Sequence, residues 1–361
     1  MSQNINLSEV LAQFVDATVM EAYGNGHIND TYSVGKAGGI LQRINTSVFP
    51  NPDDLMENIE NVTAFLRKKI AAEGGNPERE TLCIMKTIDG KSYYRLDDEH
   101  VYRMYRFVED TKTIEEGKCP EELFEAGAGF GRFQRMLEDY PAESLHEIIP
   151  NFHHTPKRVE ALKQAIAEDK VGRVSSAKRE IDFALKQAEW ADVVVKALED
   201  GSVPLRVTHN DTKINNILFD KDTGKATCVI DLDTVMPGSA LYDFGDALRV
   251  VGSTAAEDET DLNMVWFNES SFVAFARGYL SEMKDSLTKR ELELLPLSVK
   301  LITFECGTRF LTDYLNGDTY FKIHREKHNL ERARNQYKLV EDIARKETVL
   351  QEIIQTITSN E

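Results

Sequence analysis

A strand-rich island at residues 203–233, inside a half of the chain that is otherwise helical, constrains the fold more than any other feature. Two apolar runs there flank a turn at residues 220–225, in which Gly224 supplies a flexible position. Apolar runs joined by such a turn predict a β-hairpin. Counting back from the turn places Asn216 and Asp231 near each other at the open end of that hairpin.

A third polar side chain is expected at the same end. Asp211 precedes the first strand by a short loop, in the spacing H-x-D-x-x-x-x-N that starts at His209. Phosphoryl transfer uses such a set: one carboxylate accepts the proton of the attacking hydroxyl, while an amide and a second carboxylate hold Mg²⁺ against the nucleotide phosphates. The combined spacing therefore favours phosphoryl transfer over a polar hairpin whose side chains only cap the backbone.

Further acidic residues follow the hairpin. Asp233 lies two residues beyond Asp231 and is expected on the same side of an extended strand. It is either a third ligand of the metal or the substrate, or a turn residue. The stretch Asp243–Asp246 imitates the D-F-G motif of protein kinases, but the metal-binding Asp has to follow the hairpin directly, as Asp231 does. We expect Asp243 and Asp246 to support the loop around Asp211 through hydrogen bonds.

The rest of the chain divides into two parts. Residues 17–110 are mostly short β-rich runs, interrupted by one helix that is predicted to begin at Asn51–Asp54. Beyond residue 110 long amphipathic segments dominate, apart from the island. This order predicts an α+β fold with a β-rich N-terminal lobe at residues 1–109 and a larger, mostly helical lobe at 110–361. No Pro/Gly-rich linker separates the lobes, so we expect them to share a cleft.

Composition excludes several classes of function. The chain has 43 basic and 61 acidic residues, and its formal net charge of −18 repels polyanions; we expect no nucleic-acid partner and no membrane partner. No apolar run approaches the roughly 18 residues of a membrane span, and the first residues lack the basic start of a signal peptide. The cysteines lie far apart without a CxxC pair, which favours a cytoplasmic protein; they are Cys83, Cys119, Cys228 and Cys306. Nothing in the composition indicates an oligomeric state.

A resemblance to a known family is carried by stretches spread from end to end. They are YGNGHINDTY (23–32), ILQRINTSVFP (40–50), THNDTKINNIL (208–218), IDLDTVMPGS (230–239) and the segment from ECGTRFLTDYLNGDTYF (305–321) to HNLERARNQ (328–336). The chain resembles the aminoglycoside phosphotransferase and choline kinase superfamily and, within it, most closely the N-acetylhexosamine 1-kinases. The resemblance implies a bilobal, protein-kinase-like fold and ATP-dependent phosphorylation of the anomeric hydroxyl of an N-acetylhexosamine, GlcNAc or GalNAc.

The same resemblance implies roles for individual residues. Asp211 is the expected catalytic base, and Asn216 and Asp231 are the expected Mg²⁺ ligands. His27 is expected to point toward the sugar. The end of the small lobe matches the hinge of these kinases, whose backbone binds an adenine-like base whatever the side chains are; the hinge residues are Phe107, Val108 and Glu109.

The nucleotide side departs from the family pattern at one position. A turn between two predicted strands contains Gly24 and Gly26, whose backbone N–H groups can approach phosphates closely, although an ordinary hairpin turn reads the same. Kinases place a Lys on the strand that follows, but residues 40–43 read Ile-Leu-Gln-Arg. Either Gln42 or Arg43 has to take over the phosphate contact, and only Arg43 keeps the charge.

A charged stripe marks the expected acceptor side. Glu305, Arg309 and Asp313 recur at i, i+4 and i+8 in an otherwise apolar helical segment. Such a stripe either faces water or an internal ion network, or it lines the cleft, with Arg309 donating to sugar hydroxyls or the acetamido oxygen. The resemblance favours sugar contacts for Arg309 and for Tyr320, whose ring suits the C–H face of a pyranose. The alternative for Tyr320 is a packed core residue.

Other interpretations of the whole chain stay open. The same fold acting on an aminoglycoside, choline or homoserine is one, and an acidic protein also suits a polycationic acceptor. A catalytically inactive kinase-like binding module is another, supported only by the missing small-lobe Lys. The glycine-rich run at 126–131 follows helix-forming residues and not a strand, so it predicts close helix packing and not a dinucleotide-binding loop.

Overall fold

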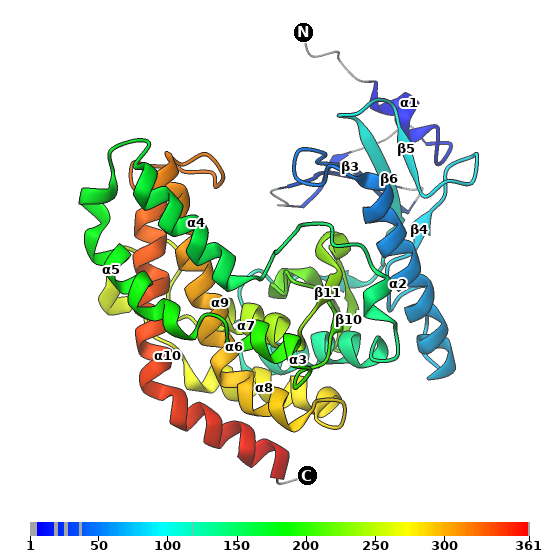
Figure 1. Cartoon of the computed structure of the whole chain (residues 1–361). Coiled ribbons are helices and arrows are strands. Elements are labelled where there is room, and N and C mark those ends of the chain that lie inside the picture. The colour runs from blue at the N-terminus through cyan, green and yellow to red at the C-terminus, as the bar shows by residue number, and fades with distance from the viewer. Residues whose placement is uncertain (1–5, 18–20, 25–27, 36–37, 118, 360–361) are drawn as a thin grey trace.

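The small lobe is built on an antiparallel sheet. A computed structural model describes residues 6–17, 21–24, 28–35, 38–117 and 119–359, and in this part of the chain the sheet has the strand order β1-β2-β3-β6-β4, with β5 also paired to β6. The strands are β1 (Glu21–Ala22), β2 (Asp30–Ser33), β3 (Gly39–Ile44), β4 (Ile84–Met85), β5 (Tyr93–Arg95) and β6 (Val101–Arg106). Helices α1 (Leu7–Leu11) and α2 (Pro52–Ala72) flank the sheet (Figure 1).

Helix α2 forms where the sequence predicts a helix. Asn51 caps it by accepting a hydrogen bond from the backbone N–H of Asp54, and Pro52 occupies the first turn. Its apolar stripe belongs to one hydrophobic core that includes Val101 of the small lobe and Phe133 of the large lobe; the buried stripe residues are Leu55, Ile59, Val62 and Leu66. The two lobes therefore share a continuous core.

The register of β3 and β6 decides which small-lobe side chains share a face of the sheet. Gln42 lies opposite Arg103, and Arg43 lies opposite Tyr102. Because successive residues of a strand point to opposite faces, Gln42 and Arg103 share one face and Arg43 points to the other.

The large lobe is mostly helical, and its strand-rich island lies on the side that faces α2 (Figure 1). Its helices are α3 (Pro120–Met136), α4 (Thr155–Glu168), α5 (Lys178–Gln187), α6 (Val193–Glu199), α7 (Ala240–Val251), α8 (Glu269–Met283), α9 (Lys289–Asn316) and α10 (His328–Ser359). Short 3-10 helices are η2 (Ala142–Ser144), η3 (Val174–Ala177), η4 (Ala188–Trp190), η5 (Ile214–Asn216), η6 (Leu232–Thr234) and η7 (Leu262–Met264). The island holds β8 (Arg206–Thr208), β9 (Ile217–Asp220) and β10 (Ala226–Val229). Just after it, β11 (Met236–Gly238) pairs with β8, and β7 (Thr111–Lys112) pairs with β9.

Helices α3 and α8 approach each other closely because glycines line their contact. A Cβ atom at Gly127 would lie 2.2 Å from the carbonyl oxygen of Phe275, and one at Gly278 would lie 1.8 Å from that of Phe124. Neither distance is compatible with a side chain, since backbone atoms cannot move aside cheaply. The prediction that the glycine-rich run at 126–131 serves helix packing is confirmed.

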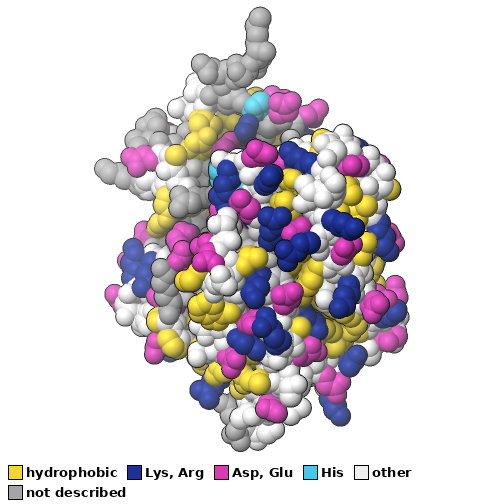
Figure 2. All heavy atoms as spheres, turned by 90° about the vertical axis from the view of Figure 1, so that its left-hand side faces the viewer, with side chains coloured by type: hydrophobic (Ala, Val, Ile, Leu, Met, Phe, Trp, Pro, Cys, Tyr) yellow, Lys and Arg dark blue, Asp and Glu magenta, His cyan; other side chains and the backbone are white. Residues whose placement is uncertain are grey.

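The predicted order of a small β-rich lobe followed by a larger helical lobe is confirmed. No helix among the described residues is long and apolar enough to span a bilayer. The surface is acidic overall, yet Figure 2 shows basic side chains interleaved with acidic ones on the face that carries α4, α5 and α10. Several are ion-paired there, for example Arg334 with Glu180 and Arg325 with Glu331.

Candidate active site

Two carboxylates of α7, those of Asp243 and Asp246, accept hydrogen bonds from the loop that follows β8. The backbone N–H groups of His209 and Asn210 donate to Asp243, at 2.9 and 2.7 Å, and that of Thr212 donates to Asp246 at 2.9 Å. These bonds satisfy buried amides that would otherwise lose hydrogen bonds to water. The prediction that Asp243 and Asp246 support this loop is confirmed.

The loop is bent sharply at Asn210, whose φ of 66° lies in the left-handed region. The Asn210 side chain donates to the carbonyl of Thr234 at 2.8 Å, which ties the loop to the segment after the hairpin. His209 contacts the carbonyl of Ile230 through Nε2 at 2.9 Å. The side chains of His209 and Asn210 thereby join the chain segments that carry Asp211 and Asp231.

The structure brings the three predicted side chains to the open end of the hairpin. β9 and β10 pair as predicted, with Val229 opposite Ile217. Asn216 donates from Nδ2 to the carbonyl of Asp211 at 2.8 Å and to its Oδ2 at 3.3 Å. The N–H of Ile230 donates to the Asn216 carbonyl at 2.9 Å, so Asp231 follows directly beside Asn216.

The two carboxylates of this group differ in their electrostatic surroundings. Burial works to raise the pKa of Asp211, but Lys213, whose Nζ lies 2.7 Å from Oδ1, outweighs it and lowers the pKa below its usual range. The pKa of Asp231 is raised to about 6, first by burial and then by Asp233 and Asp211. By its surface area, however, Asp231 is exposed to solvent, and water reduces the rise of its pKa. Sequence reasoning missed Lys213, although it stands two residues after Asp211 in the motif.

Asn216 and Asp231 suit a divalent cation whose other ligands come from a bound nucleotide. Asn216 uses Nδ2 to donate, which leaves its Oδ1 as the atom able to accept a cation. Asp231 lies among other carboxylates that repel it, and a cation relieves that repulsion. Within the described ranges no group of three or more His, Cys, Asp or Glu side chains is placed to hold a metal. A cation here would take its remaining oxygens from a nucleotide, as Mg²⁺ commonly does.

Asp233 is buried, at 3% exposure, and both of its oxygens contact the small lobe. Oδ1 forms an ion pair with Arg103 of β6, and Oδ2 accepts from Asn29 at 2.6 Å. The sequence left Asp233 as either a ligand or a turn residue, and the structure gives it an inter-lobe contact that neither alternative included. Arg103 was missed, because the register of β3 and β6 is needed to find it.

The structure describes only part of the expected nucleotide site. Gly24 has a positive φ of 75°, which favours glycine, whereas Gly26 and His27 lie outside the described residues. Arg43 is not brought to Asp231: it pairs with Asp30 at 2.7 Å on the opposite face from Gln42. In the hinge the N–H of Phe107 donates to Gly38, the carbonyl of Val108 accepts from Thr111 at 2.9 Å, and Glu109 is exposed.

The expected acceptor side contains an arginine among aromatic rings. The guanidinium of Arg309 lies 5.6, 5.8 and 5.5 Å from the ring centres of Phe152, Tyr320 and Phe321. Tyr320 is 66% exposed, so it is not a packed core residue. Asp313 accepts the backbone N–H groups of residues 319–321 and so shapes the loop that carries Tyr320. Arg309 has no hydrogen bond or ion pair to another described residue.

Glu305 belongs to an internal network and does not line the acceptor side. It is buried and accepts from Thr155 at 2.7 Å and contacts Nδ1 of His153 at 2.8 Å. The other ring nitrogen of His153 lies 3.3 Å from the carbonyl of Asn210, in the loop before Asp211. Burial opposes a charge on His153, but Glu305 outweighs it, so the pKa of His153 is raised. From the sequence, the adjacent His153 and His154 are expected to have a loop or capping role, and the contact of His153 with Glu305 is found only in the structure.

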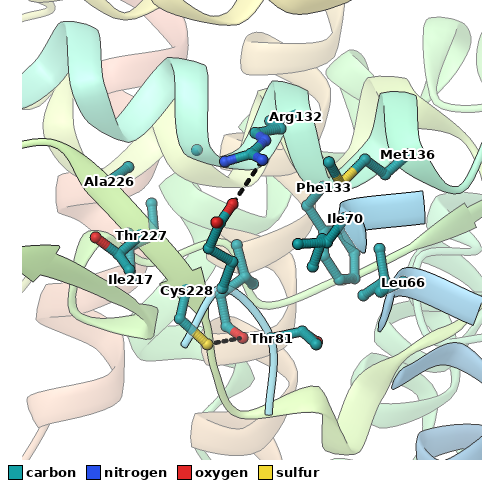
Figure 3. Close-up of a pocket in the computed structure, with 13 residues that line it drawn as sticks. Leu66, Ile70, Thr81, Arg132, Phe133, Met136, Ile217, Ala226, Thr227 and Cys228 are labelled. Carbon is teal, nitrogen blue, oxygen red and sulfur yellow. Dashed lines mark hydrogen bonds and ion pairs between the residues drawn. The ribbon is translucent and has the colours of Figure 1, made fainter. Parts of the chain in front are cut away.

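Two cavities lie away from these residues. Figure 3 shows the smaller one, where α2, α3 and the β9–β10 hairpin meet; it holds about 30 Å³, and the ion pair of Arg132 with Glu80, at 2.6 Å, lies in its wall. That volume suits a water molecule or two and no larger ligand. An open groove of about 620 Å³ runs between α5, η7 and α10, with Lys178, Glu180 and Arg334 in its walls. Neither cavity is lined by Asp211, Asn216 or Asp231.

Comparisons with known proteins agree with this geometry. A model of the phosphotransferase enzyme family matches residues 19–283. A microcompartment-associated aminopropanol kinase has 14% sequence identity and a TM-score of 0.62, over 96% of this chain and 98% of that one. An amicoumacin kinase solved with AMP-PNP and Ca²⁺ has 15% identity and a TM-score of 0.62, over 92% of both chains. An aminoglycoside phosphotransferase from Alicyclobacillus acidocaldarius has 15% identity and a TM-score of 0.59, over 100% and 98%. The predicted bilobal, protein-kinase-like fold is confirmed.

Proposed function

Because the chain belongs to the phosphotransferase enzyme family, we propose that it is an ATP-dependent kinase that phosphorylates the anomeric hydroxyl of an N-acetylhexosamine. One observation carries the kinase assignment: Asp211, Asn216 and Asp231 meet at the open end of the β9–β10 hairpin. The sugar assignment is supported by the resemblance in sequence and by the arginine and aromatic side chains of the acceptor side.

Asp211 is the proposed catalytic base. Lys213 lowers its pKa, so its carboxylate is ionised at neutral pH, which is the form that accepts the proton of the attacking hydroxyl. The anomeric hydroxyl is the most acidic one on a sugar, which suits a single carboxylate as base. Most of the barrier then falls through alignment of the reacting groups and through neutralisation of phosphate charge.

Asn216 and Asp231 are the proposed ligands of Mg²⁺, which when bound neutralises charge on the β- and γ-phosphates of ATP. The mutual repulsion of Asp231, Asp211 and Asp233 supports a cation at this point. The support of the loop by Asp243 and Asp246 keeps Asp211 in place while the metal ligands engage.

The lobe of residues 1–109 is the proposed nucleotide-binding lobe, and residues 110–361 supply the base and the acceptor contacts. Gly24 and Gly26 would let backbone N–H groups approach the phosphates, and the hinge backbone at 107–109 would bind the base. Reducing, ATP-rich cytoplasm is the proposed compartment, and the four free cysteines suit it.

Arg309, Tyr320 and His27 are the proposed sugar contacts. Asp233, which the sequence left as a ligand or a turn residue, is not among them, because it is buried and its two oxygens contact Arg103 and Asn29. Arg309 carries unused donors close to three rings, an arrangement that suits hydroxyl or acetamido oxygens next to the apolar face of a pyranose. The same guanidinium argues against a polycationic acceptor, because it would repel ammonium groups despite the acidic surface. An amino alcohol or aminoglycoside acceptor is the second candidate, and it is favoured only by the fold of the solved relatives.

The test is a coupled assay of ADP release over GlcNAc, GalNAc, choline, homoserine and kanamycin, followed by ³¹P NMR of the product. We expect turnover with an N-acetylhexosamine and a phosphorus signal coupled to H1 alone. A 6-deoxy analogue should still react, whereas a methyl glycoside, whose anomeric oxygen is capped, should not. A 6-phosphate product, or turnover of the methyl glycoside, would refute the anomeric assignment and leave the kinase assignment standing. Turnover of choline or kanamycin alone would establish the second candidate.

A further inference from the structure

A fully buried arginine lies at the junction of the two lobes. Arg103, in the middle of β6, is 1% exposed, and its guanidinium is contacted by groups from both lobes. Nε and Nη2 donate to Oε1 of Gln42 at 3.0 and 2.9 Å, Nη1 pairs with Asp233, and the ring of Tyr105 lies 5.2 Å away. A buried charge is stable only with such partners, so the guanidinium of Arg103 depends on groups from both lobes.

The partner of Arg103 in the large lobe stands next to the proposed metal ligand. Asp233 is two residues beyond Asp231, in η6, and its second oxygen accepts from Asn29 of the small lobe at 2.6 Å. Asn29 is itself fixed, because its Oδ1 accepts from the backbone N–H of Asn45 at 3.0 Å. Arg103 and Asn29 of the small lobe therefore both bind Asp233, in the segment that carries Asp231.

Arg103 supplies a positive charge on the face of the sheet where β3 has none. Gln42 stands on the strand where kinases place a lysine, and it faces the same side of the sheet as Arg103, whereas Arg43 faces the other side. Burial opposes the charge on Arg103, but Asp233 outweighs it, and Asp231 adds to the effect, so the pKa of Arg103 is raised.

We propose that Arg103 is a positioning residue: through its ion pair with Asp233 it fastens the segment of Asp231 to the small lobe and orients Asp231 toward the metal–nucleotide complex. This inference rests on the proposed function, in which Asp231 is a metal ligand. In this proposal Arg103 acts through Asp233 and makes no direct contact with the nucleotide. It also offsets one of three carboxylate charges that would otherwise repel phosphates.

The test compares four variants for nucleotide binding by calorimetry, with Mg²⁺ and with EDTA. They are Arg103→Met, Arg103→Lys, the double variant Arg103→Met/Asp233→Asn, and Arg95→Met as a control on the neighbouring strand β5, where the Arg95 side chain is 36% exposed. We expect Arg103→Met and the double variant to bind AMP-PNP about 10- to 100-fold more weakly than the wild type in Mg²⁺, as for other residues that support a metal ligand. Binding in EDTA should change little, and Arg95→Met should bind like the wild type.

The double variant separates positioning from folding. It leaves no unpaired buried charge, so it should fold even if Arg103→Met does not. Arg103→Lys keeps the charge without the planar fork and should lose less affinity than Arg103→Met. Wild-type affinity for Mg²⁺–AMP-PNP in a double variant with the wild-type melting temperature would overturn the proposal, because Arg103 would then matter only for stability.

A second readout distinguishes failure of this inference from failure of the proposed function. Amide hydrogen exchange of residues 231–235 reports how firmly this segment is held, whether or not nucleotide binds. Exchange that is faster in the double variant than in Arg95→Met supports the fastening, and equal exchange refutes it. If the wild type binds no nucleotide in Mg²⁺ or EDTA, the proposed function fails, and the orientation of Asp231 toward a nucleotide fails with it.

Discussion

Replacement of Asp211 by Asn is the most direct perturbation of the proposed site. The amide has the shape of the carboxylate, so its oxygen can still accept from Lys213, which lies 2.7 Å from the carboxylate in the wild type. The amide cannot accept a proton, and its NH₂ group would face Nδ2 of Asn216, which now donates to the carboxylate at 3.3 Å. The variant therefore loses proton acceptance and part of the hydroxyl orientation, while Asp231 stays unchanged.

The expected loss in kcat follows from these two effects. General base catalysis contributes about 10²- to 10⁴-fold, which corresponds to about 2.7–5.4 kcal/mol at about 1.36 kcal/mol per decade. Affinity for ATP should change little, because Asp211 is not a proposed ligand of the metal or of the phosphates. Stability should change by about 1 kcal/mol or less, because the ammonium group of Lys213 is half exposed and water can replace its partner.

The assay is steady-state ADP release with the best acceptor, together with calorimetry of Mg²⁺–AMP-PNP and a thermal melt. Asp222→Asn is the matched control, because it makes the same chemical change in the exposed turn of the hairpin. Retention of more than about a tenth of the wild-type kcat would refute the reasoning. Asp233 would not be the next base, since Arg103 and Asn29 occupy its oxygens.

Four further predictions test other parts of the structure. Asp231→Ala should abolish Mg²⁺-dependent nucleotide binding, and extra Mg²⁺ should rescue Asn216→Ala better than Asp231→Ala; equal rescue in calorimetry would contradict the ligand assignment. Arg309→Ala should raise KM for the sugar more than KM for ATP, by about tenfold for a charged hydrogen bond of about 1.5 kcal/mol, and equal changes in both would count against a sugar contact. The raised pKa of His153 means that its charge stabilises the fold fully below the unfolded pKa of about 6.5 and that this contribution is lost as pH rises through the folded pKa. The free energy of unfolding in urea should therefore fall more steeply from pH 6 upward in the wild type than in His153→Gln, and parallel curves would argue against a charged His153. Gly278→Ala should destabilise the fold by about 1–3 kcal/mol or more, because its Cβ would meet the carbonyl oxygen of Phe124, whereas Arg277→Ala on the exposed side of α8 should cost about 0.5 kcal/mol or less.

Local features were predictable because short stretches of chain decide them. The hairpin and its three polar residues lie within residues 211–231, where strand length and the turn determine which side chains meet. Helix α2 carries its own cap and apolar stripe, and the glycine-rich run in α3 showed by its helix-forming neighbours that it serves packing. The D-F-G-like stretch was excluded as the metal site by its position after the hairpin, and it supports the loop instead.

The charged stripe of α9 shows where sequence periodicity stops being informative. Spacing predicts that Glu305, Arg309 and Asp313 share one side of a helix, but not what covers that side. In the structure Glu305 contacts His153, Asp313 shapes the loop before Phe321, and Arg309 alone lies among aromatic rings. Each partner comes from a different segment, and Glu305 and His153 are 152 positions apart.

The sequence by itself determined the two-lobed order, the hairpin with Asp211, Asn216 and Asp231, and the absence of a lysine on β3. Only the tertiary structure decided which cation lies on the face of the sheet that Gln42 occupies. Alternation along a strand places Gln42 and Arg43 on opposite faces, but the register with β6 brings Arg103 to the face of Gln42, and the packing of the lobes brings Asp233 to Arg103. The physical reason is that a buried charge is stable only where its partners converge, and these partners come from strands and loops far apart in the chain.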